Sequence, residues 1–297
     1  MMFARVRSLA MNIASARIYV DVLKSSSEMR AWSRARRRAG DTIAFVPTMG
    51  YLHEGHLSLV TGAKERADRV VTSIYVNPGQ FAPHEDFDTY PRDAAGDHEK
   101  LLALGCDAVF EPSNLYGSAH QTWLRVEELE RPLCGTSRPT FFRGVATVVC
   151  KLFNIVEPDI AVFGKKDFQQ WRIIERMAED LDFGVQIVGL PLIREPDGLA
   201  MSSRNARLSP EDRFAACSLS KALFEARDAV SNGTVNAESL REGIAQTLLT
   251  AGAQVDYIEI VDQITLKPVK KIDGPTVIAL AAHVGDVRLI DNVEVHP

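Results

Sequence analysis

Cysteine is scarce in this sequence, and long hydrophobic runs are missing. The four cysteines are Cys106, Cys134, Cys150 and Cys217, and no two of them form a C-x-x-C pair. Their spacing therefore excludes the common zinc and thioredoxin-type motifs, and we expect reduced, mostly buried thiols in a cytoplasmic protein. No apolar stretch approaches the roughly 20 residues that cross a bilayer, so no membrane-spanning segment is predicted.

An excess of basic charge is also lacking. The formal net charge of the 297 residues is -5, whereas binding to nucleic acid or anionic membranes needs a basic surface that neutralises phosphates. The composition disfavours both kinds of partner but allows a local basic pocket for a nucleotide. A chain of this length is typical of two domains.

The first residues differ in character from the rest. They carry Arg5, Arg7 and Arg17 and no acidic residue before Asp21, which gives them the flavour of a transit peptide. Met11 makes a start codon placed too early an equally good explanation. We therefore predict that residues 1–15 are an extension, disordered or miscalled, outside the fold.

From residue 42 to about 189 the pattern alternates between strand and helix. Apolar or β-branched runs predict strands at 42–47, 69–76, 106–112, 159–164 and 185–193. Helical periodicity predicts helices at 56–68, 93–104, 144–156 and 168–181. Such alternation predicts a Rossmann-like parallel sheet with helices on both faces, and we assign it residues 16–192.

The composition changes near residue 193. Residues 194–213 are polar and contain prolines and glycine, which indicates a hinge and loop. Helices are expected near 210–231 and 236–251, followed by β-rich runs at 255–262, 276–284 and 287–295. We predict that residues 193–297 form a smaller α+β domain with an antiparallel sheet.

The H-x-G-H sequence within 47–60 points to phosphate chemistry. It follows the first strand of the predicted sheet, and Gly50 permits a tight turn there. His53 and His56 flank a helix start, where free N–H groups and the helix dipole favour an anion. Gly55 would let the backbone approach a phosphate. The spacing is not the H-E-x-x-H of zinc proteases, so nucleotide binding is favoured over zinc.

The A-M-S-S-R-N sequence at 200–205 becomes informative when it is paired with H-x-G-H. Two hydroxyls and an arginine suit β- and γ-phosphates, although such a loop alone is usually solvated surface. Class I aminoacyl-tRNA synthetases and related nucleotidylyl transferases show the same order of motifs. A synthetase for tRNA is unexpected because no anticodon-binding domain fits in the remaining length.

Two further turns carry polar side chains at the same edge of the predicted sheet. In the first, Lys166 and Asp167 follow a strand, where they could meet an α-phosphate and a ribose, or could simply begin an exposed helix. In the second, Asn77 and Gln80 suit a substrate with hydroxyl groups, or an ordinary turn.

Taken together with 141–149 and the closing G-D-V-R-L-I-D-N, these blocks resemble the pantothenate synthetase family from about Ile18 to the end. The resemblance implies an ATP-dependent carboxylate–amine ligase. Pantoate would attack Mg-ATP to give pantoyl-adenylate and pyrophosphate, and β-alanine would then displace AMP to give pantothenate. It also implies a homodimer, Mg²⁺, and a second domain that acts as a mobile lid over the labile adenylate.

The resemblance also assigns roles by position. The catalytic residues are expected to be His53, His56 and Lys166. The ATP-binding residues are expected to be Met49, Gly164, Lys166, Asp167, Ser202, Ser203 and Arg204, with Met49 also lining the pantoate pocket. Substrate binding is expected from Gln80, Gln170, Asn77 and Arg143, and a magnesium contact from Asp97.

Three positions depart from the usual family pattern. Gly79 replaces a common methionine, Lys165 a common glutamate, and Gly96 a second acidic residue near magnesium. The last change weakens the expected metal environment. Two other functions remain open: an H-x-G-H transferase that adenylylates a phosphate instead of a carboxylate, and a nucleotide-binding regulatory module without catalysis.

Overall fold

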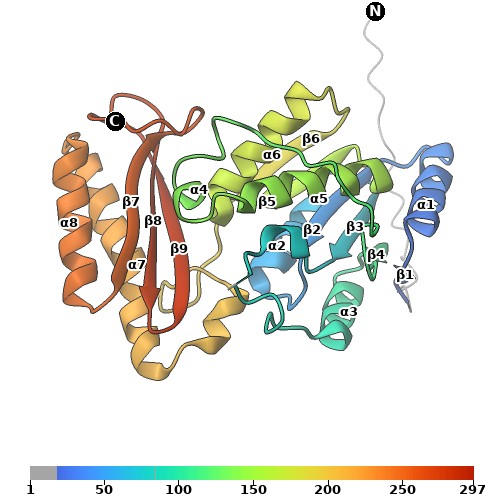
Figure 1. Ribbon diagram of the computed structural model, residues 1–297, viewed down its shortest axis with the longest axis horizontal. Coiled ribbons are helices and arrows are strands. Elements are labelled where there is room, and N and C mark those ends of the chain that lie inside the picture. Colours follow the sequence, from blue (N-terminus) through green and yellow to red (C-terminus); the bar gives the residue numbers. More distant parts are fainter. Residues whose placement is uncertain (1–18, 84) are drawn as a thin grey trace, which may run out of the picture.

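The computed structural model describes residues 19–83 and 85–297, which form two units side by side, each built from a sheet and helices (Figure 1). The extension predicted for residues 1–15 lies outside the described residues. The N-terminal unit has a six-stranded sheet in which all neighbouring strands are parallel. In spatial order the strands are β1 (Asp21–Leu23), β4 (Ala108–Phe110), β3 (Arg69–Ile74), β2 (Ile43–Thr48), β5 (Ile160–Gly164) and β6 (Gln186–Leu190).

Helices cover both faces of this sheet, as the sequence predicts. On one face, the strand residues Phe45 and Phe163 belong to a core shared with α1 (Ser26–Arg38), α5 (Phe141–Val156) and α6 (Phe168–Asp180). Val46 and Val162 point the other way, toward α2 (Glu54–Lys64) and α3 (Ala94–Ala103). The alternation of neighbouring residues between the two cores follows from the period of two along a strand.

The apolar stripe predicted for the helix at 144–156 is confirmed in α5. All six of its members are buried, namely Val145, Val148, Val149, Leu152, Phe153 and Val156. The helix begins earlier than its stripe, at Phe141, and ends at Val156. The next residue, Glu157, has a left-handed φ of 51°. The following Pro158 prevents its continuation.

The C-terminal unit is an antiparallel sheet backed by two helices. Its strands β7 (Gln254–Asp262), β8 (Thr276–Val284) and β9 (Val287–Val295) pair in chain order. The helices α7 (Pro210–Ser231) and α8 (Ala237–Thr250) lie on the outer side of the sheet, which places the sheet between them and the N-terminal unit (Figure 1). The predicted fold class is therefore confirmed.

The central strand of this second sheet is buried on both faces. Ile278 and Leu280 pack with α7 and α8, while Val277 and Ala279 belong to the core of the parallel sheet. The two units thus share apolar contacts. The predicted domain boundary at 192/193 falls just after β6.

Four short elements complete the fold of the described residues. They are η1 (Pro78–Gln80), α4 (Cys134–Ser137), η2 (Lys165–Asp167) and η3 (Ser203–Arg207). Across the described part of the chain, no helix combines the length and apolarity that a bilayer crossing needs.

The order of the strands fixes where a ligand can bind. Chain order runs outward from β2 in both directions, through β3 and β4 on one side and through β5 and β6 on the other. Parallel sheets bind ligands outside the carboxyl ends of the strands at such a switch point. The H-x-G-H sequence follows β2 and Lys166 follows β5, so both lie at this place.

Candidate active site

A single cavity gathers most of the residues predicted for the site. Both units contribute to its walls, through the ends of β2 and β5, the short helices η1 and η3, and strand β9. The predicted residues that line it are Met49, His53, His56, Asn77, Gln80, Gly164, Lys166, Asp167, Gln170, Ser202, Ser203 and Arg204. The structure does not bring Arg143 and Asp97 into this set.

The turn before α2 is held by Asp97. Gly50 has a φ of +82° and Tyr51 a φ of 52°, so the chain reverses through two left-handed residues. The Asp97 carboxylate accepts hydrogen bonds from the backbone N–H groups of Tyr51 and Leu52, both at 2.7 Å. A Cβ at Gly50 would lie 3.0 Å from that carboxylate. Asp97 therefore fixes the turn that delivers His53.

The two histidines cap their own helix. His53 Nδ1 accepts from the Gly55 N–H at 3.2 Å, and His56 Nδ1 accepts from the His53 N–H at 3.4 Å. Since each Nδ1 is an acceptor, a neutral ring carries its proton on Nε2. The expectation of free N–H groups at this helix start is wrong for Gly55, whose N–H is already paired with His53. A side chain at Gly55 would also have no room, because its Cβ would lie 2.9 Å from the His53 ring.

Both imidazoles are neutral at pH 7. Burial, aided by the nearby Lys166 charge, lowers the pKa of His53 from 6.5 to about 4. Burial and the neighbouring His53 lower the pKa of His56 from 6.5 to about 3. The two ring centroids lie 4.1 Å apart, and the ring planes are tilted by 37°. The site thus offers two neutral N–H donors side by side.

Lys165 and Lys166 lie in the turn that follows β5, the lysine turn, and the C-terminal unit holds this turn in place. The Asn292 side chain donates to the carbonyls of Lys165 and Lys166, at 3.0 and 2.9 Å. Lys165, which departs from the family pattern, forms an ion pair with Glu294 at 2.9 Å. Lys166 Nζ lies 3.8 Å from an Asp167 oxygen, so a cation and a carboxylate face the cavity together.

The side-chain amides of Asn77 and Gln80 both line the cavity and are hydrogen-bonded to each other. The Asn77 side chain donates to Gln80 Oε1 at 3.0 Å and to the Gly144 carbonyl at 3.1 Å, and accepts from the Tyr116 hydroxyl at 2.8 Å. Asn77 is therefore engaged within the protein and orients Gln80. Gln80 in turn donates to Met49 Sδ at 3.2 Å.

Ser202, Ser203 and Arg204 form a loop, the serine-arginine loop, which packs onto the turn that leads to His53. Ser202 Oγ accepts from the Arg204 N–H at 3.2 Å, and the Ser203 hydroxyl donates to the Tyr51 carbonyl at 3.3 Å. Ser203 is only 8% exposed. The alternative of a solvated surface loop is thereby excluded.

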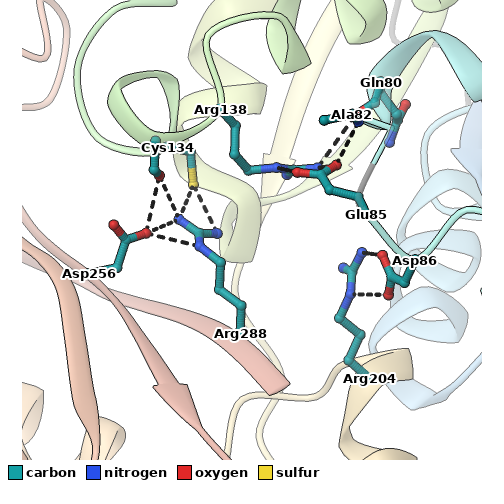
Figure 2. A network of polar contacts seen from close by, with 10 residues as sticks. Gln80, Ala82, Glu85, Asp86, Cys134, Arg138, Arg204, Asp256 and Arg288 are labelled. Atoms are coloured by element: carbon teal, nitrogen blue, oxygen red, sulfur yellow. Dashed lines mark hydrogen bonds and ion pairs between the residues drawn. The ribbon is translucent and has the colours of Figure 1, made fainter. Parts of the chain in front are cut away.

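Sequence reasoning missed two arginines of the cavity, Arg138 and Arg288. Arg138 follows α4, where no motif marks it, whereas Arg288 lies within the G-D-V-R-L-I-D-N block. Arg288 pairs with Asp256 at 2.6 Å and approaches Cys134 Sγ at 3.6 Å (Figure 2). Arg143 instead stacks on the indole ring of Trp123, with its guanidinium 4.5 Å from the ring centroid.

Comparisons with known proteins agree on one family. The model of the family described as Pantoate-beta-alanine ligase matches residues 21–294. A pantoate–beta-alanine ligase of Oryza sativa subsp. japonica is 53% identical over 302 residues, which cover 93% of this chain and 96% of the relative.

Solved structures give the same result. Pantothenate synthetase from Thermus thermophilus is 40% identical with a TM-score of 0.88, over 94% of this chain and 100% of that one. Pantoate-beta-alanine ligase from Francisella tularensis, complexed with beta-gamma ATP and beta-alanine, is 33% identical with a TM-score of 0.77, over 92% and 97% of the two chains. The chain therefore belongs to the pantoate–β-alanine ligase family.

Proposed function

We propose that this chain condenses pantoate with β-alanine to form pantothenate, with ATP as the activating substrate and pantoyl-adenylate as the intermediate. One observation carries the proposal: the H-x-G-H turn, Lys166, the serine-arginine loop, Gln80 and Gln170 line one cavity at the switch point of the sheet. The ATP and β-alanine bound to the Francisella tularensis relative support the same assignment.

In the first half-reaction the pantoate carboxylate attacks the α-phosphorus of ATP. The Nε2–H groups of His53 and His56, together with the Lys166 ammonium, meet the negative charge that moves over the phosphates. Because Nδ1 of each imidazole accepts a backbone hydrogen bond, the Nε2–H donors are oriented before the substrate arrives. Donors fixed in advance stabilise a transition state without reorganisation.

The remaining predicted contacts divide between the nucleotide and the acid. Gly164 and Asp167 are proposed to hold the ribose, and Ser202, Ser203 and Arg204 the departing pyrophosphate.

The hydroxyl groups of pantoate are proposed to meet Gln80 and Gln170, beside Met49. Asn77 acts by orienting Gln80, to which it donates at 3.0 Å. The amine of β-alanine then attacks the acyl carbon, the acyl–oxygen bond to AMP breaks, and pantothenate forms. Binding both reactants in line supplies much of the rate.

Magnesium is proposed to arrive with ATP. Within the described residues there is no group of three histidine, cysteine or acidic side chains that could hold a metal ion. The Asp97 carboxylate already accepts two backbone hydrogen bonds. Mg²⁺ commonly binds substrate phosphates and water with few protein ligands, which fits this cavity, and contact with Asp97 stays a prediction.

The domain and assembly assignments also stay predictions. We propose that residues 16–192 bind nucleotide and pantoate, that residues 193–297 close over them as a lid, and that the protein is a cytoplasmic homodimer. Light scattering on purified protein tests the homodimer, and a fluorescent fusion tests the cytoplasmic location. Hydrogen exchange with and without ATP and pantoate tests the lid.

The two-step reaction has a direct test. With ATP and pantoate alone, the protein should exchange labelled pyrophosphate into ATP; adding β-alanine should release AMP and pantothenate, measured by mass spectrometry. If exchange requires β-alanine, the adenylate is wrong. A product that retains the nucleotide would instead indicate an H-x-G-H transferase acting on a phosphate.

A further inference from the structure

Two arginines of the cavity, Arg138 and Arg204, form bidentate ion pairs with carboxylates that are adjacent in the sequence. Arg138 donates from Nε and Nη2 to the two oxygens of Glu85, both at 2.6 Å. Arg204 donates from Nε and Nη2 to the two oxygens of Asp86, at 3.0 and 2.9 Å. Figure 2 shows both pairs, which reach this segment from opposite sides. The two guanidinium groups are therefore held in the same side-on manner.

Each guanidinium is also fixed across its flat face. Arg138 lies over the Phe141 ring, 3.7 Å from its centroid, and Arg204 lies over the Tyr90 ring at 5.6 Å. A carboxylate in the plane and an aromatic ring on the face leave little freedom of rotation. In the described part of the chain neither Nη1 has a hydrogen bond, so each arginine has one nitrogen without a protein partner.

The segment that carries the carboxylates holds its own shape. Glu85 accepts from the Ala82 N–H at 3.2 Å and donates its own N–H to the Ala82 carbonyl at 2.9 Å. Arg92 donates to the carbonyls of Phe87 and Tyr90, at 3.1 and 2.8 Å. Glu85 and Asp86 are thus presented by a folded turn.

Both carboxylates are ionised at neutral pH. Burial alone would raise the pKa of Glu85, but hydrogen bonding to Arg138 and the charge of that arginine lower it overall. Burial and Arg204 act on the pKa of Asp86 in the same two opposing ways, again with a net lowering. Each arginine therefore has a charged partner before any substrate binds.

We propose that Glu85 and Asp86 are positioning residues, which orient Arg138 toward pantoate and Arg204 toward pyrophosphate. Arg138 lies at the pantoate side because its Nη2 is 3.4 Å from the Gln80 carbonyl. Arg204 belongs to the serine-arginine loop. This inference rests on the proposed function, which assigns those two ends of the cavity.

Neutralising each of the two carboxylates should change a different kinetic constant. Asp86→Asn keeps the side-chain shape but removes the charge that holds Arg204, so kcat for pyrophosphate exchange should fall about tenfold or more, with the KM for pantoate nearly unchanged. Glu85→Gln should instead raise the KM for pantoate by about tenfold. Simple disruption of the turn would impair both quantities in both variants, and that result would overturn the proposal.

Arg207 offers a matched control. It also contacts Asp86, at 3.0 Å, but is not among the residues that line the cavity. Arg207→Ala should leave exchange unchanged. In a double-mutant cycle, Asp86→Asn should add little to Arg204→Ala if Asp86 acts through Arg204. Independent, additive losses would overturn the proposal.

Two further outcomes would also overturn it. One is a near-normal Asp86→Asn beside a crippled Arg204→Ala. The other is a lowered KM for ATP in Asp86→Asn, which would make Asp86 a competitor of phosphate.

If Asp86→Asn fails to fold, Arg204→Lys replaces it. Lysine keeps the positive charge but cannot form the bidentate pair with Asp86, so this variant should also lose kcat. Absence of exchange in the unaltered protein would refute the proposed function instead.

Discussion

The two imidazoles of the H-x-G-H sequence use their ring nitrogens for different purposes. Nδ1 of His53 and of His56 accepts a backbone N–H at the start of α2, which satisfies groups that a helix otherwise leaves unpaired. Nε2 is then the protonated atom that a phosphate can meet. One pair of residues therefore caps the helix and is also proposed to supply the catalytic donors, so a simple truncation of either residue would mix the two effects.

A substitution that preserves the cap separates these effects. His53→Ala should lose the cap, at a cost of about 0.5–2 kcal/mol in the free energy of unfolding, and also about 100- to 1000-fold in kcat for exchange. His53→Asn should keep most of the stability, since asparagine is a favoured N-cap residue, while its shorter side chain withdraws the donor from the phosphate.

Thermal unfolding and exchange kinetics on the same preparations decide the matter. We expect similar kcat values for the two variants but a higher Tm for His53→Asn. If His53→Asn retained near-normal kcat, capping would be the whole role of His53, and the catalytic assignment would be lost.

The lowered histidine pKa values predict an unusual pH profile. The pKa is about 4 for His53 and about 3 for His56, so neither ring gains a proton between pH 8 and roughly 5. The profile of kcat/KM for ATP reports ionisations of the free enzyme. We expect no acid limb near 6.5 from these residues. A limb near 6.5 that disappears in His53→Asn would contradict the neutral pair.

Stability should follow the same ionisation with a defined sign. Below pH 6.5 an unfolded histidine binds a proton that the folded His53 refuses until about pH 4. The unfolded state therefore binds more protons in this window, and stability falls as pH is lowered through it. Denaturant unfolding of the unaltered protein and of His53→Asn, at pH 7 and pH 5, should show the steeper loss in the unaltered protein.

At the scale of helices and strands, local patterns predicted what depends on neighbours in the chain. The stripe of α5 and the turn at Gly50 both follow from sequence spacing, and both are confirmed. β1 and α1 were not predicted, although Ser25 and Glu28 form the capping box that begins α1. That signal was available in the sequence.

Contacts between distant segments could not be predicted in the same way. The grip of Glu85 on Arg138 joins residues 53 positions apart, and no local spacing encodes it. Arg143 shows the converse: it lies in a block that resembles the family, yet its side chain packs on Trp123. A motif indicates which backbone segment lies at the site, but packing decides which of its side chains point into the cavity.

Asp97 connects α3 to the histidine turn, which leads to a test of its role. Asp97→Asn replaces an acceptor of two N–H groups with an amide that can accept at only one oxygen. Losing a buried hydrogen bond to a charged group costs about 1.5–3 kcal/mol. We expect a lower Tm and a lower kcat, because the turn that delivers His53 loosens.

Magnesium titration distinguishes this structural role from metal binding. If Asp97 only holds the turn, excess Mg²⁺ should leave the kcat of Asp97→Asn unchanged. Recovery of kcat at high Mg²⁺, with an unchanged Tm, would establish the metal contact that the family resemblance implies.

At the scale of the whole molecule, strand β9 ties the two units together beside the cavity. Asn292 binds the backbone of the lysine turn. The neighbouring Asp291 forms an ion pair with Arg194, at 2.6 Å, in the segment that links the units. Glu294 adds the pair with Lys165. Movement of the C-terminal unit would therefore be transmitted directly to the backbone of Lys166.

A charge exchange tests this coupling. Lys165→Glu would place a carboxylate against Glu294, whose side chain is 32% exposed, so repulsion should separate β9 from the lysine turn. We expect a Tm lower by about 2–4 °C, since a partly exposed ion pair contributes about 1 kcal/mol at most, and a raised KM for ATP as Lys166 shifts. The double variant Lys165→Glu with Glu294→Lys restores opposite charges and should recover most of both losses. Calorimetry and exchange kinetics on all three variants provide the comparison. If the double variant were as impaired as Lys165→Glu, the pair would not couple the two units, and the hydrogen bonds of Asn292 would be left to hold the lysine turn.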